Sequence, residues 1–350
     1  MKITFLCPDL RVSGGVRVIL AFADRLAGRG HHVELVVPAW SRLKVLSRTV
    51  RRVAPTWLPR FRASIRWVKQ WAPNLLPDGH VILATMWRSA PVVAEAPPRC
   101  GAKFYLVQHY ESLYNGPPES VDATYRLPLR KIAVSTWIRD IMQERFQEPA
   151  EVLIPPVDAE LFYRVPVRTG TPRPRVLMLH HEAPWKGVAD GVEAVDRVRR
   201  NVPQLYLVGF GVRGPDQGGL FDEFHANPAQ QELARLYSGC DIYLCPSWDE
   251  GLGLPPMEAM ACGAALVTYD NGGSRDYARH GETALVARRR DVHDLAAKLE
   301  RMATDAALRA RIAGAGMAFV RTKFTWDDAV RRMEELFQDA VASVPGTAGN

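Results

Sequence analysis

Two glutamates lie eight positions apart in the run SWDEGLGLPPMEAMACGAALV, which spans residues 247–267. Glu250 is in a glycine-rich turn, and Glu258 is in a helical pattern that opens on a proline pair, a favourable place for proline. Carboxylates accept hydrogen bonds from hydroxyl groups, and the amides at a helix start attract phosphate. The layout suits a ligand with polyol and phosphate parts. On spacing alone, a capped surface helix with two solvated glutamates explains it equally well.

The same run resembles the Glu-x7-Glu motif of the retaining glycosyltransferases of family 4 (group 1 type), whose usual form is close to EGFGLPPLEAMACGTPV. The resemblance implies that Glu250 contacts the hydroxyls of a donor sugar and that Glu258 contacts the ribose of its nucleotide. It also implies that nearby backbone amides approach the sugar and the pyrophosphate. These amides belong to Gly251, Leu252, Gly253 and Leu254.

Further pieces of the family pattern occur in the expected order along the chain. Gly14 and Gly15 resemble the N-terminal glycine loop that lies against the donor phosphate, and Gly209, in YLVGFG, matches the family's lvGxG element. His109, in LVQHYE, resembles the active-site histidine that touches the donor sugar; the alternative is a loop histidine satisfied by ordinary contacts. Glu111 follows closely and is a candidate for the acceptor side, although no motif supports that assignment.

Lys186, in PWKG, resembles the family lysine that neutralises the donor pyrophosphate, whereas a lysine before a glycine is otherwise usually a surface residue. The family commonly has an arginine five residues earlier, where this chain has His181. Histidine can donate one hydrogen bond to a phosphate, but it lacks the planar fork and the permanent charge of arginine. We therefore expect phosphate binding to weaken at high pH.

Two other patterns suggest chemistry that the sequence argues against. His180, His181 and Glu182 are consecutive, so in an extended segment the two histidines point to opposite faces, and we expect no metal site there. Residues 209–214 spell G-x-G-x-x-G, but a proline and two glycines soon follow where a dinucleotide site needs a helix. No nicotinamide, flavin or metal cofactor is therefore expected.

Strand-like apolar runs alternate with helical patterns, from residues 3–6 to residues 265–267, which is the rhythm of parallel sheets covered by helices. At 350 residues the chain is long enough for two domains. We expect an α/β protein of the GT-B type, with two doubly wound Rossmann-like domains that face a deep interdomain cleft. The expected bounds are an acceptor-side domain over 1–165 and a donor-binding domain over 166–325. A last helix over about 326–341 packs back on the first domain, and 343–350 is a disordered tail.

The net charge of +7 is concentrated between Glu34 and Asp78, where no acidic residue occurs. Residues 40–71 combine arginines and lysines with tryptophans, a composition typical of helices at a membrane interface. We expect this segment to dock on an anionic membrane surface; a solvated helical pair with its tryptophans on the sheet is the alternative. Nucleic acid is not expected as a partner, since no element that reads bases accompanies the charge.

Composition points to the cytoplasm, with peripheral contact to the inner membrane face. The five cysteines are scattered and odd in number, no apolar run approaches the ~18 residues of a membrane span, and MKITFLCPD is typical of a first strand. The resemblance implies metal-independent, front-face transfer of a hexose-type sugar from a nucleotide-diphosphate sugar. The acceptor would be a hydroxyl group on a lipid-linked molecule or an envelope glycan. A sugar-nucleotide epimerase, a phosphorylase and a nucleotide-sugar-binding protein without turnover are the alternatives.

Overall fold

The computed structural model describes residues 1–38, 60–167, 170, 174–215 and 219–343, which form two compact units. Unit 1 comprises Met1–Pro155 together with the C-terminal segment from Trp326, and unit 2 comprises Pro156–Thr325. The division falls before the boundary expected after residue 165, so the segment 156–165 groups with unit 2. The expected tail lies outside the described residues from position 344 onward.

Unit 1 is built on a seven-stranded, wholly parallel sheet with the strand order β3-β2-β1-β4-β5-β6-β7. The strands are β1 (Lys2–Leu6), β2 (His32–Pro38), β3 (Ser64–Val68), β4 (Val81–Ala84), β5 (Ala102–Val107), β6 (Arg130–Ala133) and β7 (Ala150–Val152). The helices are α1 (Gly14–Gly28), α2 (Ala90–Ala94), α3 (Pro118–Tyr125), α4 (Thr136–Phe146) and α10 (Trp326–Ala342). The chain order reverses between β1 and β4, the place where doubly wound sheets bind ligands.

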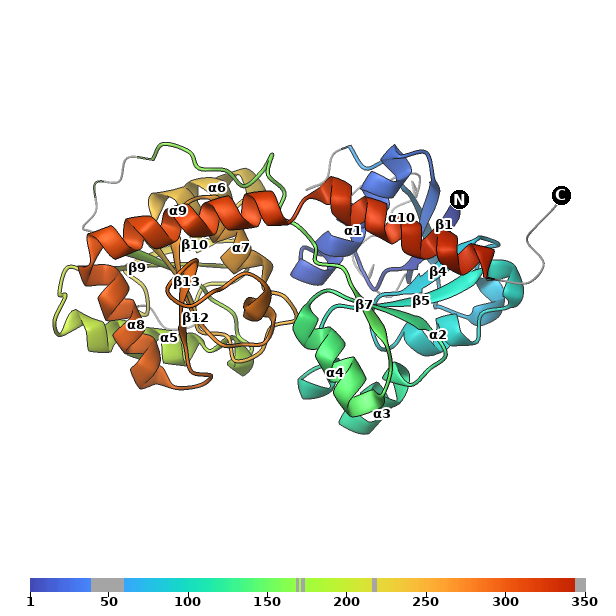
Figure 1. The fold of residues 1–350 in the computed structure, drawn as a ribbon, viewed down its shortest axis with the longest axis horizontal. Helices are drawn as coiled ribbons and strands as arrows, with labels where there is room; N and C mark the ends of the chain where they lie inside the picture. Colours follow the sequence, from blue (N-terminus) through green and yellow to red (C-terminus); the bar gives the residue numbers. More distant parts are fainter. Residues whose placement is uncertain (39–59, 168–169, 171–173, 216–218, 344–350) are drawn as a thin grey trace. The chain divides into compact units, whose positions relative to one another are not determined.

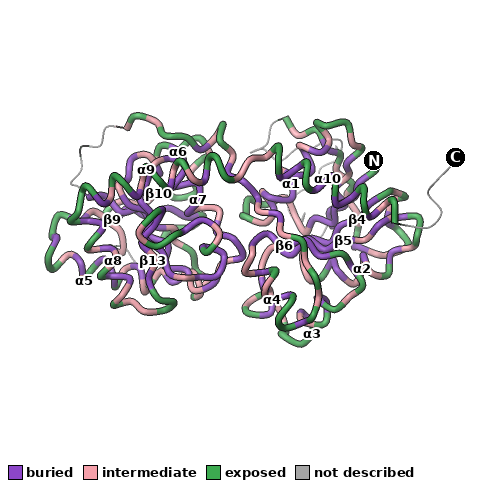
Figure 2. The backbone as a smooth tube through the Cα atoms, viewed as in Figure 1, coloured by how far each residue is buried: buried purple, intermediate pink, exposed green. Residues whose placement is uncertain are grey.

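The central strands of unit 1 are buried on both faces because helices cover the sheet on each side. Leu6 and Ile82 are wholly buried on neighbouring strands, and Figure 2 shows the strands of both sheets mainly in the buried colour. This double burial explains why the strands are nearly continuous apolar runs rather than alternating ones.

Helix α10 closes one face of unit 1, beside α1 (Figure 1). Phe337 packs edge-on against Phe104 of β5, with ring centroids 5.0 Å apart. Glu334 accepts hydrogen bonds from Arg29 and lies 2.7 Å from His31 Nε2. The end of the chain thus packs on its beginning through an aromatic contact and an ion-pair network.

The basic segment differs from its expected form wherever it is described. Residues 39–59 lie outside the described residues, whereas residues 64–68 form β3 rather than part of an interfacial helix. Arg62 pairs with Asp24, and Arg66 pairs with Glu34. Trp71 is buried and donates its indole N–H to the carbonyl of Val36. The described part of the segment, residues 60–71, therefore belongs to the fold of unit 1; Trp71 packs on the sheet as in the alternative interpretation, but a strand stands where that interpretation had a helix.

Unit 2 is built on a six-stranded parallel sheet with the order β10-β9-β8-β11-β12-β13. The strands are β8 (Arg175–Leu179), β9 (Tyr206–Gly211), β10 (Glu223–Ala226), β11 (Ile242–Cys245), β12 (Ala265–Tyr269) and β13 (Ala284–Ala287). The helices are α5 (Val188–Arg199), α6 (Gln230–Gly239), α7 (Leu254–Ala261), α8 (Val292–Thr304) and α9 (Ala306–Lys323). Helices α5 and α8 pack together, as do α7 and α9 (Figure 1). The chain order reverses between β8 and β11.

Candidate functional site

The strongest candidate residues of unit 2 meet at the point where its strand order reverses. Lys186 ends the short 3-10 helix η5 (Pro184–Lys186) after β8, and Glu250 follows β11, the neighbouring strand. Lys186 Nζ lies 2.7 Å from Glu250 Oε1, and both side chains are mostly buried. The fold therefore brings together a cation and a carboxylate that are far apart in the sequence.

Gly187 sets the position of the lysine. Its φ is +64°, and a Cβ there would lie 2.0 Å from the carbonyl oxygen of Pro246. Only glycine fits this close approach at little cost, because it lacks a Cβ and accepts positive φ. The turn after β8 consequently lies directly against the loop after β11.

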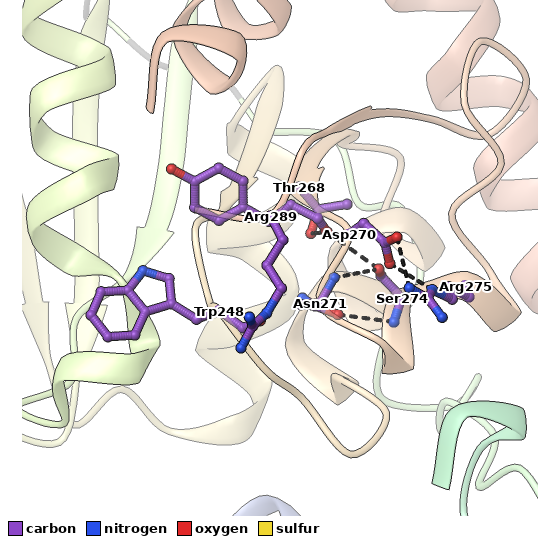
Figure 3. Close-up of polar contacts among 8 residues, drawn as sticks. Trp248, Thr268, Asp270, Asn271, Ser274, Arg275 and Arg289 are labelled. Atoms are coloured by element: carbon purple, nitrogen blue, oxygen red, sulfur yellow. Dashed lines mark hydrogen bonds and ion pairs between the residues drawn. The ribbon is translucent and has the colours of Figure 1, made fainter. Parts of the chain in front are cut away.

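The loop that carries Glu250 is held by the glycine loop after β12. Glu250 N–H donates to the Asn271 carbonyl at 3.0 Å, and Gly273 N–H donates to the Glu250 carbonyl at 3.1 Å. Figure 3 shows how Asn271 and Ser274 close the second loop: each donates a backbone N–H to the side-chain oxygen of the other. Neighbouring Asp270 and Arg275 form an ion pair at its surface. Glu250 is thus fixed by its backbone as well as by Lys186.

The four successive amides of residues 251–254 follow Glu250 and lead into the first residue of α7. Within the described part of the chain, no backbone or side-chain acceptor takes a hydrogen bond from the N–H groups of residues 251–254. Gly253 has φ +95°, and Pro255 and Pro256 remove the next two N–H donors of the helix. Consecutive amides in such a turn form a concave donor surface for an anion.

Glu258 lies in the middle of α7 and is 2% exposed. It accepts a hydrogen bond from the hydroxyl of Tyr237, on α6, at 3.0 Å. A buried carboxylate needs such partners, since its desolvation is otherwise costly. The predicted contact with a ribose stays a prediction, and the structure adds a packing role that the sequence did not indicate.

His181 lies near Lys186, and its surroundings keep it neutral. Partial burial lowers the pKa of its imidazole below the usual 6.5, and the positive charge of Lys186 lowers it further. Its Nδ1 accepts the N–H of Ala183 at 3.0 Å, so a neutral ring carries its hydrogen on Nε2. His181 therefore has one hydrogen to donate and, at neutral pH, no charge.

Gly209 has a packing reason to be glycine that differs from its predicted role in donor binding. It lies inside β9, where a Cβ would come 2.5 Å from the ring of Phe221. A larger residue would displace this aromatic ring. Its predicted approach to a donor stays a prediction.

Three of the predicted site residues, Gly14, Gly15 and His109, lie in unit 1. Gly14 and Gly15 begin α1, whose N-cap Ser13 accepts the N–H of Val16 at 3.3 Å. A Cβ on Gly15 would lie 3.4 Å from the amide group of Gln108, which immediately precedes His109. The N-terminal glycine loop thus neighbours the loop after β5, across the reversal point of this sheet.

Tyr125 holds the turn that carries His109. Its hydroxyl accepts the N–H of Glu111 at 2.9 Å and donates to the carbonyl of His109 at 3.4 Å. The carboxylate of Glu111 accepts the N–H of Trp87, at 2.8 Å, and the hydroxyl of Tyr105. Burial raises the pKa of Glu111 to about 7, against the opposing effect of these hydrogen bonds. Sequence reasoning found Glu111 but had no motif with which to assign it.

The described residues contain neither a metal-ligand cluster nor a membrane-spanning helix. No group of three or more histidine, cysteine, aspartate or glutamate side chains there is placed to hold a metal ion. No helix among these residues is long and apolar enough to cross a bilayer.

Comparison with known families matches both units. The model of "Glycosyltransferase Family 4" matches residues 12–161, and that of "Glycosyl transferases group 1" matches residues 162–318. The O-antigen biosynthesis protein of Myxococcus xanthus is 28% identical over 337 residues, which cover 92% of this chain and 26% of that protein. The chain therefore spans about a quarter of the length of this relative. A GDP-mannose-dependent alpha-(1-6)-phosphatidylinositol monomannoside mannosyltransferase of Mycobacterium tuberculosis is 25% identical, over 93% of this chain and 94% of its own.

Solved structures share the architecture. Sucrose-phosphate synthase from Thermosynechococcus elongatus superposes with a TM-score of 0.81 at 18% identity, covering 98% of this chain and all of that one. HepE of Anabaena, in complex with UDP-glucose, has a TM-score of 0.78 at 18% identity, covering 97% of this chain and all of that one. These similarities confirm the predicted pair of doubly wound domains, while the predicted interdomain cleft stays a prediction. The two family models match in chain order, and this chain belongs to the group 1, family 4 glycosyltransferases with the GT-B fold.

Proposed function

We propose that this protein is a retaining glycosyltransferase that moves a hexose-type sugar from a nucleotide-diphosphate sugar to a hydroxyl acceptor. The observation that carries the proposal is the contact of Lys186 with Glu250, beside the amides of residues 251–254. In a nucleotide sugar, the pyrophosphate is bonded directly to the sugar ring. A cation, a row of amides and a carboxylate within one small region match that arrangement of charge and hydroxyl groups.

The Lys186–Glu250 pair is suited to exchange partners when a donor binds. The Lys186 ammonium would donate hydrogen bonds to the phosphate oxygens, and the sugar hydroxyls would donate hydrogen bonds to the Glu250 carboxylate. Both charged side chains would then keep hydrogen-bond partners, which limits the cost of breaking a mostly buried ion pair. Glu258 would contact the ribose and His181 the phosphate, through its Nε2 hydrogen.

Transfer with retention would proceed on one face of the sugar ring. The bond between the anomeric carbon and the leaving phosphate oxygen breaks as the acceptor oxygen bonds to the same face of that carbon. The acceptor proton passes to the leaving phosphate, and because the acceptor oxygen attacks the anomeric carbon directly, the reaction needs no protein nucleophile; the proposed transfer is independent of metal ions. Lys186 and the loop amides would stabilise the charge that develops on the phosphate, usually the largest catalytic contribution of such groups. His109 is the proposed contact to the donor sugar.

The relatives guide the choice of donor and acceptor. One relative depends on GDP-mannose, and HepE binds UDP-glucose, so UDP and GDP are the carriers that we propose. The same mannosyltransferase acts on a phosphatidylinositol monomannoside, and another relative serves O-antigen biosynthesis. These names favour a lipid-linked or envelope-glycan acceptor, and with it a place at the cytoplasmic face of the membrane.

We propose that residues 40–71 dock on an anionic membrane surface, with a smaller contribution from two of the arginines than the sequence suggested. Arg62 and Arg66 already have acidic partners, so they contribute less to lipid binding than unpaired arginines would. Co-sedimentation with anionic and neutral liposomes at low salt tests the proposal. Equal recovery of the protein with both kinds of vesicle would favour a soluble acceptor.

Mass spectrometry of reaction products, after a panel of UDP and GDP sugars is offered with a polyol acceptor, tests the proposed function. NMR of the product determines whether the anomeric configuration is retained. Conversion of the donor to a stereoisomer without an acceptor would favour an epimerase. Donor binding without release of the nucleotide, across acceptors, would favour a binding protein.

A further inference from the structure

The two residues before Glu250 contact the segment that follows β13, residues 288–290, which we call the arm. We call the contacts of Arg289 with Trp248 and Asp249 the clasp. Arg289 donates through one guanidinium nitrogen to both oxygens of Asp249, at 2.7 and 2.6 Å, and through Nε to the carbonyl of Trp248 at 3.0 Å. The guanidinium of Arg290 stacks on the indole of Trp248, 3.8 Å from the ring centroid. Figure 3 shows Arg289 extending toward the Trp248 segment.

Trp248 is held from its other side by the elements that carry Lys186. Its backbone N–H donates to the carbonyl of Trp185 at 2.8 Å. Its indole N–H donates to Asp190 of α5 at 3.0 Å, and the Tyr269 hydroxyl donates to the same oxygen at 3.1 Å. A single segment therefore links the turn after β8, the end of β12 and the arm after β13.

This segment sets the distance between Lys186 and Glu250. Trp185 directly precedes the lysine, and Asp249 directly precedes the glutamate. The bond from Trp248 to Trp185 aligns the two backbones, and the Arg289–Asp249 pair prevents the second backbone from turning away. Since Asp249 is 4% exposed, its carboxylate depends on this pairing far more than a surface carboxylate would.

We infer that Arg289 is a positioning residue that, through Asp249, holds Glu250 and the amides of residues 251–254 in the geometry that binds the donor. Arg289 acts without touching the donor, and its contribution falls on donor binding rather than on the acceptor. The inference rests on the proposed function for the role of the loop, but the geometry of the clasp can be tested without any ligand.

Hydrogen exchange of the full chain tests the clasp directly. In Arg289→Met, the backbone amides of Trp248 and Glu250, which donate to the carbonyls of Trp185 and Asn271, should exchange at least about tenfold faster, which corresponds to the loss of one hydrogen bond to a charged group. Arg288→Met is the matched control: Arg288 belongs to the same arm but pairs with Asp291 and Asp294. Unchanged exchange in Arg289→Met, or equal acceleration in both variants, would overturn the inference.

Calorimetry with UDP and GDP gives the functional readout. Arg289→Met should weaken binding on the order of tenfold, while Arg289→Lys restores only part of it because a single ammonium lacks the fork. The apparent KM of the donor should rise and that of the acceptor should stay constant.

A buried carboxylate without its partner can also destabilise the whole unit, so the double variant Asp249→Asn/Arg289→Gln provides a second measurement. This variant removes both charges of the pair, and its fold should be close to wild type in thermal unfolding. It should still bind nucleotide more weakly if the charged clasp positions the loop; wild-type affinity would show that the pair only stabilises the fold. If Lys186→Met also left affinity unchanged, the proposed function rather than the clasp would be wrong.

Discussion

Removing the charge of Lys186 is the most direct test of the donor assignment. Lys186→Met keeps most of the aliphatic chain and deletes the ammonium group that lies 2.7 Å from Glu250 Oε1. At an effective dielectric constant of ~20, two unit charges at this distance interact by roughly 6 kcal/mol before desolvation is counted. Desolvation offsets most of this, and a charge-assisted hydrogen bond contributes about 1.5–3 kcal/mol net. We expect the same loss when the ammonium binds phosphate.

That loss corresponds to a Kd for nucleotide diphosphate that is about 10- to 150-fold higher, since 1.36 kcal/mol is a factor of ten. Isothermal titration of UDP and of GDP measures it. The control is Lys298→Met on α8, whose lysine is similarly exposed and pairs with Asp294 at 3.4 Å. Affinity within threefold of wild type in Lys186→Met, with the control also unchanged, would refute the reasoning.

Three further predictions concern Glu258, His181 and Glu111. Glu258→Gln should weaken nucleotide binding in titration, whereas Glu258→Ala should also lower the free energy of unfolding by about 1–3 kcal/mol, measured in denaturant, because it removes the acceptor of the Tyr237 hydroxyl. Because the pKa of His181 is lowered, the donor affinity of the wild type should rise only as the pH falls below about 6.5. The variant His181→Arg should bind the donor at least as tightly, with an affinity that stays constant across this pH range. Much weaker binding by this variant would point to another role for the ring. The raised pKa of Glu111 gives a contribution to stability that is fully present below pH 4.5 and is lost as the pH rises through about 7. Between pH 4.5 and 8, the unfolding free energy of Glu111→Gln should therefore gain up to about 3 kcal/mol relative to wild type. A difference between the two proteins that stays constant with pH would contradict this.

Local pattern was sufficient for the elements that are apolar along their whole length. The strands β4 and β11 were expected from their runs of apolar residues, because strands covered on both faces need apolar side chains at every position. The strands β3, β10 and β13 were missed. Strand β3 is a partly exposed edge strand, so it contains a charged residue, Arg66, next to Trp67. This mixture of basic and aromatic residues suggested a membrane surface instead of a strand.

The sequence by itself determined the family, the order of the site elements and the candidates Lys186, Glu250 and Glu258, since these depend on residue type and spacing along the chain. Only the tertiary structure decided which of them meet. Lys186 and Glu250 are in contact because β8 and β11 are neighbours where the strand order reverses, a pairing between distant segments that no local periodicity encodes. The partnership of Arg289 with Asp249 has the same origin: both lie at the carboxyl edge of one parallel sheet, where loops from distant parts of the chain converge.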